Sequence, residues 1–265
     1  MNKLRNNEFL FEVFALIIIA IIVHGVYTTV VRPQADAIAA ADSAQMAKDP
    51  DFVPQRSVFV IVKDYEQEVC FVLALWAFAI MGYKAFMLRR AGTLLATGVL
   101  RLPDGMKILP EDSRDYARQV EALPAELRGE LLPRALQSGL HRFGATRNIQ
   151  DVSSAIRDVC ELEYGRLESE LSMVRYVAWA IPAIGFIGTV RGIGESLQQA
   201  HKAVEGDVSG VVSGLGIAFN STLVALGLSI LVMFMLHQIQ LRQERAVLDT
   251  EEYLDQHVVR QMLVR

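Results

Sequence analysis

Two apolar stretches of the chain carry small residues and one threonine each at helical spacing. In residues 181–194 these residues fall three or four positions apart: Gly185, Gly188, Thr189 and Gly192. In residues 206–222 they recur at every fourth position: Gly206, Gly210, Gly214, Ala218 and Thr222. Side chains at these spacings share one face of a helix. A threonine hydroxyl donates and accepts hydrogen bonds without carrying charge, so each stripe offers one neutral polar group.

Asn220 and Ser221 add two more polar side chains directly before Thr222. Three successive hydrogen-bonding groups at membrane depth are costly on a lipid-facing surface, so we expect them to face protein or a water-filled path. A structural interpretation stays open, because a threonine hydroxyl can also bond the carbonyl four residues earlier in its own helix. The presence of a threonine in both stripes favours a functional role.

The small residues also permit close helix packing. Helices in lipid associate through van der Waals contact, and small side chains let their backbones approach. Pro182 lies at the start of the first stripe and is assigned to the same packing surface. Because the connection between the two stretches is short, we expect the stripes to face each other as a helical hairpin.

Arg191 is the most prominent charge near these helices. Glu195 lies four residues further on, so an ion pair along one helix is expected. Glu12 and His24, in an earlier apolar run, are weaker candidates for a role in ion passage, because each lies near an end of that run.

The composition is that of a membrane protein. Of 265 residues, 52% are apolar and 21% charged, and the mean hydropathy is +0.29. The net charge of −4 gives no reason to expect nucleic-acid binding, which needs a clustered basic face. Cys70 and Cys160 lack the paired spacing of a metal or redox motif. No P-loop, metal-ligand cluster or nucleophile-and-base motif occurs, so we expect neither an enzyme nor a bound metal or cofactor.

Four apolar runs are predicted to be transmembrane helices, since an isolated strand cannot satisfy its backbone in lipid. They cover residues 9–31, 69–88, 174–193 and 208–239. The first could instead be a signal peptide, but its apolar centre is long for one. The fourth exceeds the ~20 residues that cross a bilayer, so it must tilt or project beyond it. The fold class is therefore all-α, with four membrane helices and long helices that extend into a cytoplasmic helical region.

Lys and Arg near the span ends predict the orientation. They place the N-terminus, residues 89–172 and the C-terminus in the cytoplasm, and residues 32–68 outside. The predicted segments are the first span (1–31), an external loop (32–68), the second span (69–88), a cytoplasmic helical region (89–172), a helical hairpin (173–240) and a C-terminal helix (241–265).

Prolines are expected to interrupt both polar regions. The external loop contains Pro33, Pro50 and Pro54, and the cytoplasmic region contains Pro103, Pro110, Pro124 and Pro133. The external loop could be a plain spacer or a binding site. A longer helix should begin near Asn148, with Asp151 or Ser153 as its N-cap. Its apolar stripe comprises Val152, Ile156, Val159, Leu162, Leu167 and Leu171. We expect this helix to pack against the one that follows residue 240.

The chain resembles the MotA/TolQ/ExbB family of ion-channel motor subunits. The resemblance lies in IPAIGFIGTVRGIGESL (residues 181–197) and GLGIAFNSTLVALGLSILVMF (residues 214–234). A proline followed by G-x-x-G-T-V-x-G-I in one span, then a small-residue-rich span with a threonine, is a specific combination. The long cytoplasmic segment before the third span and the short outer turn also fit.

The resemblance implies a bacterial inner-membrane motor driven by ion flow, of protons in TolQ/ExbB-like members. Five copies would surround two copies of a single-span ExbD/TolR/MotB-like partner, whose intramembrane Asp would titrate. Thr189 matches the threonine of the family's GTV motif, and Thr222, with Ser221 beside it, matches the threonine of the following span. Their hydroxyls would form the surface along which ions reach that Asp.

Two positions depart from the family pattern. Many relatives carry a Glu just before the threonine of the last span, whereas the nearby polar residue here is Asn220. The position after GTV is often aromatic and here is Arg191, whose charge would disfavour cation entry unless Glu195 neutralises it. Four spans match the flagellar type in number, so a flagellar-type stator stays an alternative, as does a non-conducting membrane scaffold.

Overall fold

The computed structural model describes residues 2–46, 48–49, 52, 57–97 and 107–264. Pro50, Pro54 and Pro103, which the sequence analysis treats as helix breakers, lie outside the described residues. The chain forms two compact units. The first comprises Met1–Met81 with Met173–Leu236, and the second comprises Gly82–Ser172 with His237–Arg265.

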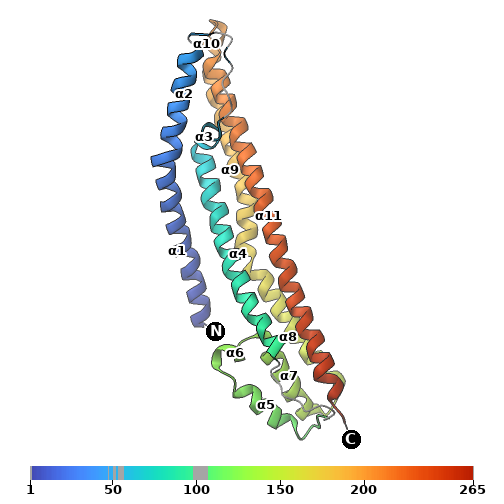
Figure 1. Ribbon diagram of the computed structural model, residues 1–265. Helices are drawn as coiled ribbons and strands as arrows, with labels where there is room; N and C mark the ends of the chain where they lie inside the picture. The colour runs from blue at the N-terminus through green and yellow to red at the C-terminus, as the bar shows by residue number, and fades with distance from the viewer. Residues whose placement is uncertain (1, 47, 50–51, 53–56, 98–106, 265) are drawn as a thin grey trace. The chain divides into compact units, whose positions relative to one another are not determined.

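The described part of the chain is almost entirely helical (Figure 1). The long helices of the first unit are α1 (Asn2–Val26), α2 (Arg32–Met46) and α9 (Ser172–Gln198), together with the parts of α4 (Tyr65–Thr97) up to Met81 and of α11 (Ser209–His257) up to Leu236. The short elements between them are the π-helical segment η1 (Tyr27–Val31), α3 (Val58–Val62) and α10 (Ala200–Val204). Among the described residues, four continuous helical stretches are long and apolar enough to cross a membrane: Phe9–Met46, Tyr65–Leu88, Ile149–Gln198 and Ser209–Gln261. The prediction of an all-α membrane protein with four spans is confirmed.

The first helical stretch is longer than predicted. Pro33 does not break it, and residues 32–46 of the expected external loop continue as α2. Pro33 has no N–H with which to bond the carbonyl four residues earlier. Directly before it the helix widens in η1, where the Arg32 N–H donates to the Tyr27 carbonyl five residues back. A wider turn of this kind keeps a helix continuous where the regular hydrogen-bond pattern is interrupted.

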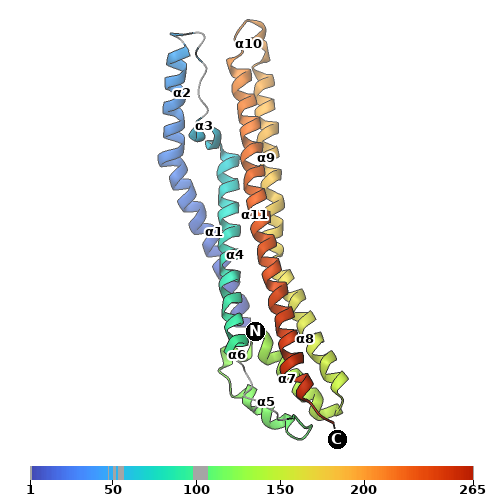
Figure 2. The same cartoon turned by 45° about the vertical axis from the view of Figure 1, so that its right-hand side comes forward.

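Helices α9 and α11 lie side by side as an antiparallel hairpin (Figure 2). At Gly192 a side chain would not fit, since a Cβ atom there would lie 2.5 Å from the Ala218 nitrogen and 2.5 Å from the Gly214 carbonyl oxygen. Gly185 and Gly188 likewise lie against Ala225 and Ser221 of α11. The predicted facing of the two stripes is therefore confirmed, with backbones in direct contact.

Hydroxyl groups bridge the same interface. Pro182 leaves the Ala178 carbonyl without its usual helical donor, and the Ser229 hydroxyl of α11 donates to that oxygen at 3.1 Å. Toward the other end of the hairpin, the Ser196 hydroxyl lies 3.0 Å from the Val211 carbonyl. Buried backbone groups in lipid need such partners.

Gly206 was wrongly assigned to the packing stripe. It lies before α11 in the turn after α10, where its φ of +102° is a conformation that side chains rarely adopt. Nothing lies within 4 Å of a Cβ placed on it. The next residue, Asp207, accepts hydrogen bonds from the Ser209 nitrogen and hydroxyl at the start of α11, and these bonds hold the pKa of Asp207 below its usual range. Gly210 does lie at an interface, against the side chain of Gln199, the residue directly after α9.

The second unit contains α5 (Ser113–Glu121), α6 (Ala125–Arg128), α7 (Leu131–Thr146), α8 (Ile149–Glu170) and the 3₁₀ turn η2 (Val259–Gln261). Pro110, Pro124 and Pro133 lie before or in the first turns of α5, α6 and α7, as expected. The predicted cap of α8 was wrong, since Asn148 rather than Asp151 or Ser153 accepts the Gln150 N–H. Leu171 alone separates α8 from α9.

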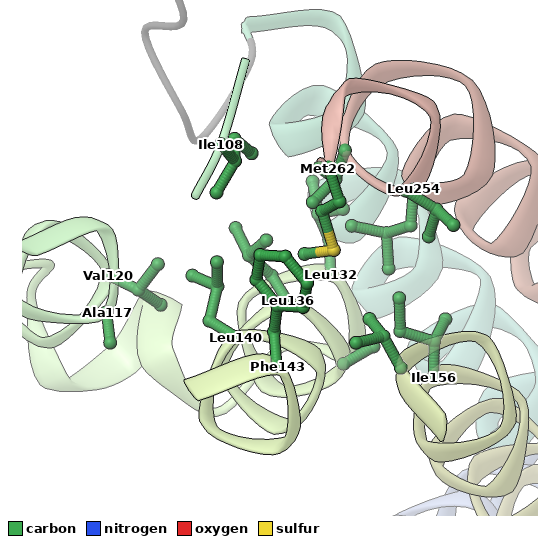
Figure 3. Packing of buried hydrophobic residues seen from close by; sticks show 14 of the residues in the cluster. Ile108, Ala117, Val120, Leu132, Leu136, Leu140, Phe143, Ile156, Leu254 and Met262 are labelled. Atoms are coloured by element: carbon green, nitrogen blue, oxygen red, sulfur yellow. The ribbon is translucent and has the colours of Figure 1, made fainter. Parts of the chain in front are cut away.

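The core of this unit joins α5, α7, α8 and the end of α11 around Leu136 and Phe143 (Figure 3). The expected packing of α8 against the C-terminal helix is confirmed by Ile156 and Leu254, which share this core. Leu162 of the predicted stripe is an exception, because it is 69% exposed. The chain's end also joins the core, since Met262 is buried and pairs with Ile108 in a short parallel bridge.

The hairpin geometry predicts that Gly192→Ala destabilises the protein. The added methyl group would meet backbone atoms of α11, and overpacking of this kind costs about 1–3 kcal/mol. Gly194→Ala is the matched control on the same helix, because nothing lies within 4 Å of its Cβ position. Thermal unfolding of the detergent-solubilised protein should show a lower midpoint for the first variant only. Equal midpoints would contradict the backbone contact.

A second prediction concerns Leu254, which is fully buried in the core of the second unit. Leu254→Ala should lower the free energy of unfolding by about 2–5 kcal/mol, because it leaves a cavity. Leu248→Ala, at a residue 55% exposed on the same helix, should change it by less than about 0.5 kcal/mol. Denaturant unfolding monitored by circular dichroism measures both, and equal losses would show that the end of α11 is not packed as described.

Candidate functional site

The two threonines singled out from the sequence lie together. The hydroxyls of Thr189 on α9 and Thr222 on α11 are hydrogen-bonded to each other, and both residues are half-buried. The Thr189 hydroxyl also lies 3.1 Å from the Ala218 carbonyl and 3.2 Å from the Gly185 carbonyl. The Thr222 hydroxyl lies 3.5 Å from that same Gly185 oxygen. Each hydroxyl therefore has a partner hydroxyl and a carbonyl within reach.

This arrangement permits two directions of hydrogen bonding. A hydroxyl has one proton to donate and two lone pairs to accept with. Thr222 can donate to Thr189 while Thr189 donates to Ala218, or Thr189 can donate to Thr222 while Thr222 donates to Gly185. In each direction the last proton faces a backbone carbonyl, which is too weak a base to take it, so the pair passes a proton on only when that hydroxyl turns from the carbonyl to an outside base. Such a relay needs an acid and a base from elsewhere, because neither hydroxyl ionises readily.

Ser221 and Asn220 do not join the threonines on one face. Successive residues in a helix are about 100° apart, so Asn220 points some 200° away from Thr222. Asn220 is half-buried, and within the described part of the chain no hydrogen bond of its side chain is found. Ser221 is buried, and its hydroxyl faces Gln67 of α4 at 3.5 Å. The expected polar surface therefore consists of the threonine pair with Ser221 behind it.

The first turn of α4 supplies the polar groups that the sequence analysis missed. Three successive side chains of this turn contact different helices. Glu66 binds Arg191 of α9, Gln67 contacts Ser221 of α11, and Glu68 binds His24 and Arg32. Two acidic residues at the start of a predicted span were visible in the sequence, but nothing local indicated their partners.

Arg191 is held mainly by Glu66. Its Nε and Nη2 atoms lie 2.7 and 2.8 Å from the two carboxylate oxygens of Glu66. The predicted pair with Glu195 is also present, at 2.8 Å from Nη1. Asp64 lies 3.5 Å from Nη2; burial raises the pKa of its carboxyl, which Arg191 opposes. One guanidinium therefore faces three carboxyl groups, so its charge is matched at this end of the hairpin.

A second set of charged side chains links the first helical stretch to α4. Glu68 is buried and accepts hydrogen bonds from Arg32 and from His24, whose Nδ1 lies 2.7 Å away. Arg32 lies over the rings of Tyr27 and Tyr65, at 5.5 and 4.3 Å from their centroids. His24 therefore lies at a helix contact, with its side chain 64% exposed.

The fold and the site define a class of protein, an all-α membrane protein whose last two spans pack as a tight hairpin joined by hydroxyl groups. Residues 128–252 match the model of the MotA/TolQ/ExbB proton channel family, the family that the sequence motifs resemble. The matched segment includes Thr189 and Thr222, whereas α1 and α4 lie before it. Comparisons with curated proteins and with solved structures gave no match.

The contact between α4 and α9 predicts that exchanging Glu66 and Arg191 restores the stability that each single substitution removes. Glu66→Arg alone places two guanidinium groups together, and Arg191→Glu alone gathers four carboxyl groups. Each should cost more than the ~1 kcal/mol of an exposed pair and less than the ~3–5 kcal/mol of a fully buried one. The double variant should recover most of the loss in unfolding midpoint. A double variant no more stable than the weaker single variant would refute the contact.

Proposed function

We propose that this chain is the channel-forming subunit of a proton-driven motor in the bacterial inner membrane. The observation that carries the proposal is the hydrogen-bonded pair of Thr189 and Thr222, which joins two spans inside the segment matched by a proton channel family. In this proposal the N- and C-termini are cytoplasmic, and ion flow is converted into mechanical work on the cell envelope. The chain itself has no enzymatic step.

The threonine pair would serve as a neutral relay. A proton would enter at one hydroxyl while the other hydroxyl turns from its carbonyl and gives a proton to an outside base. The titrating acid would come from a single-span ExbD/TolR/MotB-like partner with an intramembrane Asp, as the family resemblance implies. The matching of Arg191 by Glu66, Glu195 and Asp64 supports this, because the arginine then presents no uncompensated positive charge to an approaching cation.

The exposed faces of the hairpin support assembly with other chains. Large apolar side chains point outward from both helices, among them Phe186, Ile187 and Val190 on α9 and Phe219 and Leu223 on α11, each more than half exposed. In a membrane such faces contact lipid, a second copy or a partner helix. We propose a homopentamer around two partner chains.

One observation favours a non-conducting scaffold instead. Both threonine hydroxyls lie within reach of backbone carbonyls, so they could serve only to close the hairpin. The scaffold predicts no ion flux when the chain is co-expressed with a single-span partner. A flagellar-type stator is the other alternative, and normal swimming of a strain lacking the gene would exclude it.

The decisive variant replaces both threonines with valine, which has nearly the same shape without the hydroxyl. Thr189→Val with Thr222→Val should leave the complex assembled and reduce proton flux into reconstituted vesicles to background. Thr29→Val is the matched control, because the Thr29 hydroxyl donates only to the Gly25 carbonyl of its own helix, at 2.7 Å. Full flux in the double variant would refute the relay, and loss of assembly would support the scaffold.

A further inference from the structure

Gln67 is an unusual residue for a membrane helix. It is completely buried, whereas glutamine side chains are mostly exposed in proteins. Its Nε2 donates to the Ile61 carbonyl at 3.1 Å and lies 3.5 Å from the Ser221 hydroxyl. Its Oε1 atom, in contrast, has no hydrogen-bond partner among the described residues. Because the contact with Ile61 sets the amide orientation, the free oxygen cannot be satisfied by exchanging the two ends of the amide.

Ser221 forms the opposite side of this buried polar region. Ser221 is 1% exposed, and no acceptor for its hydroxyl proton is found in the described part of the chain. Gly188 faces it, since a Cβ there would lie 2.5 Å from the Ser221 oxygen and 3.2 Å from the Glu66 side chain. Thr222 follows Ser221 and Thr189 follows Gly188. The region therefore lies directly behind the threonine pair, between α4, α9 and α11.

The polar groups of this region determine which kind of ligand it can bind. A buried amide oxygen without a partner is disfavoured by about 1–3 kcal/mol. In proteins such groups are usually satisfied by an ordered water, which needs two or more polar partners. Gln67 offers an acceptor and Ser221 offers both a donor and an acceptor. Both groups are neutral, so they suit a neutral hydrogen-bond donor better than a bare metal cation, which would need several oxygens around it.

We propose that Gln67 Oε1 and the Ser221 hydroxyl hold a water molecule inside the protomer, behind Thr189 and Thr222. This water extends the polar path from the threonine pair toward Glu66 and the Arg191 that it binds. The place of this water in the path rests on the proposed function, whereas the water site itself does not. Gln67 thus belongs to the wall of the path, although its helix, α4, lies before the segment that matches the family (residues 128–252).

The test combines a map with two variants. A density map of the intact complex at a resolution that shows waters should contain a peak about 2.7–3.2 Å from Gln67 Oε1. Gln67→Leu, which keeps the volume but removes both ends of the amide, should lower proton flux about tenfold, equivalent to about 1.4 kcal/mol in barrier height. Ser221→Ala should lower it in the same direction and serves if the first variant does not fold. Gln198→Leu, at an exposed position of α9, should not change it.

The outcomes separate this proposal from the proposed function. A well-resolved map without the peak would overturn the water site. A map with the peak, together with full flux in both Gln67→Leu and Ser221→Ala, would overturn its place in the path. Full flux in the double threonine variant would instead refute the proposed relay, and the density at Gln67 would then still decide the water site by itself.

Discussion

Backbone contact between α9 and α11 is the constraint on which the rest of the first unit depends. Lipid offers no hydrophobic drive for two helices to meet, so their association relies on close packing and on polar bonds across the interface. Gly192 supplies close packing of the two backbones, because α11 occupies the space that a side chain would need. Ser229 and Thr189 supply bonds to carbonyls of the opposite helix. The threonine pair is held at a fixed separation only because the glycines allow this approach.

The same closeness limits what the pair can do. Two neutral hydroxyls in contact can hand on a proton, but neither can hold a charge at neutral pH. The charged groups lie instead at the first turn of α4, where Glu66 and Glu68 bind arginines from two different helices. In a low-dielectric setting an unpaired charge is costly, so pairing across helices both neutralises the groups and fixes the helices against each other.

Pro182 and Pro33 show how one residue type has different effects in two membrane helices. At Pro182 the carbonyl left without a helical donor finds the Ser229 hydroxyl on a neighbouring helix. At Pro33 the helix widens into a π-helical segment and continues. In both places the helix continues because the interrupted hydrogen-bond pattern is accommodated, by a side chain or by the backbone itself.

The sequence by itself determined the four apolar helices, the small-residue faces of the hairpin and the presence of one threonine in each face. These follow from local patterns, namely length, spacing and a short connection. Only the tertiary structure decided that Glu66 binds Arg191, since the two are 125 positions apart and their contact depends on how each helix is rotated. It also decided that Gly206 belongs to a turn, whereas the direction of Asn220, away from the pair, follows from helical spacing alone. A period of four residues does not reveal where a helix begins, and adjacency in sequence does not place side chains on one helical face.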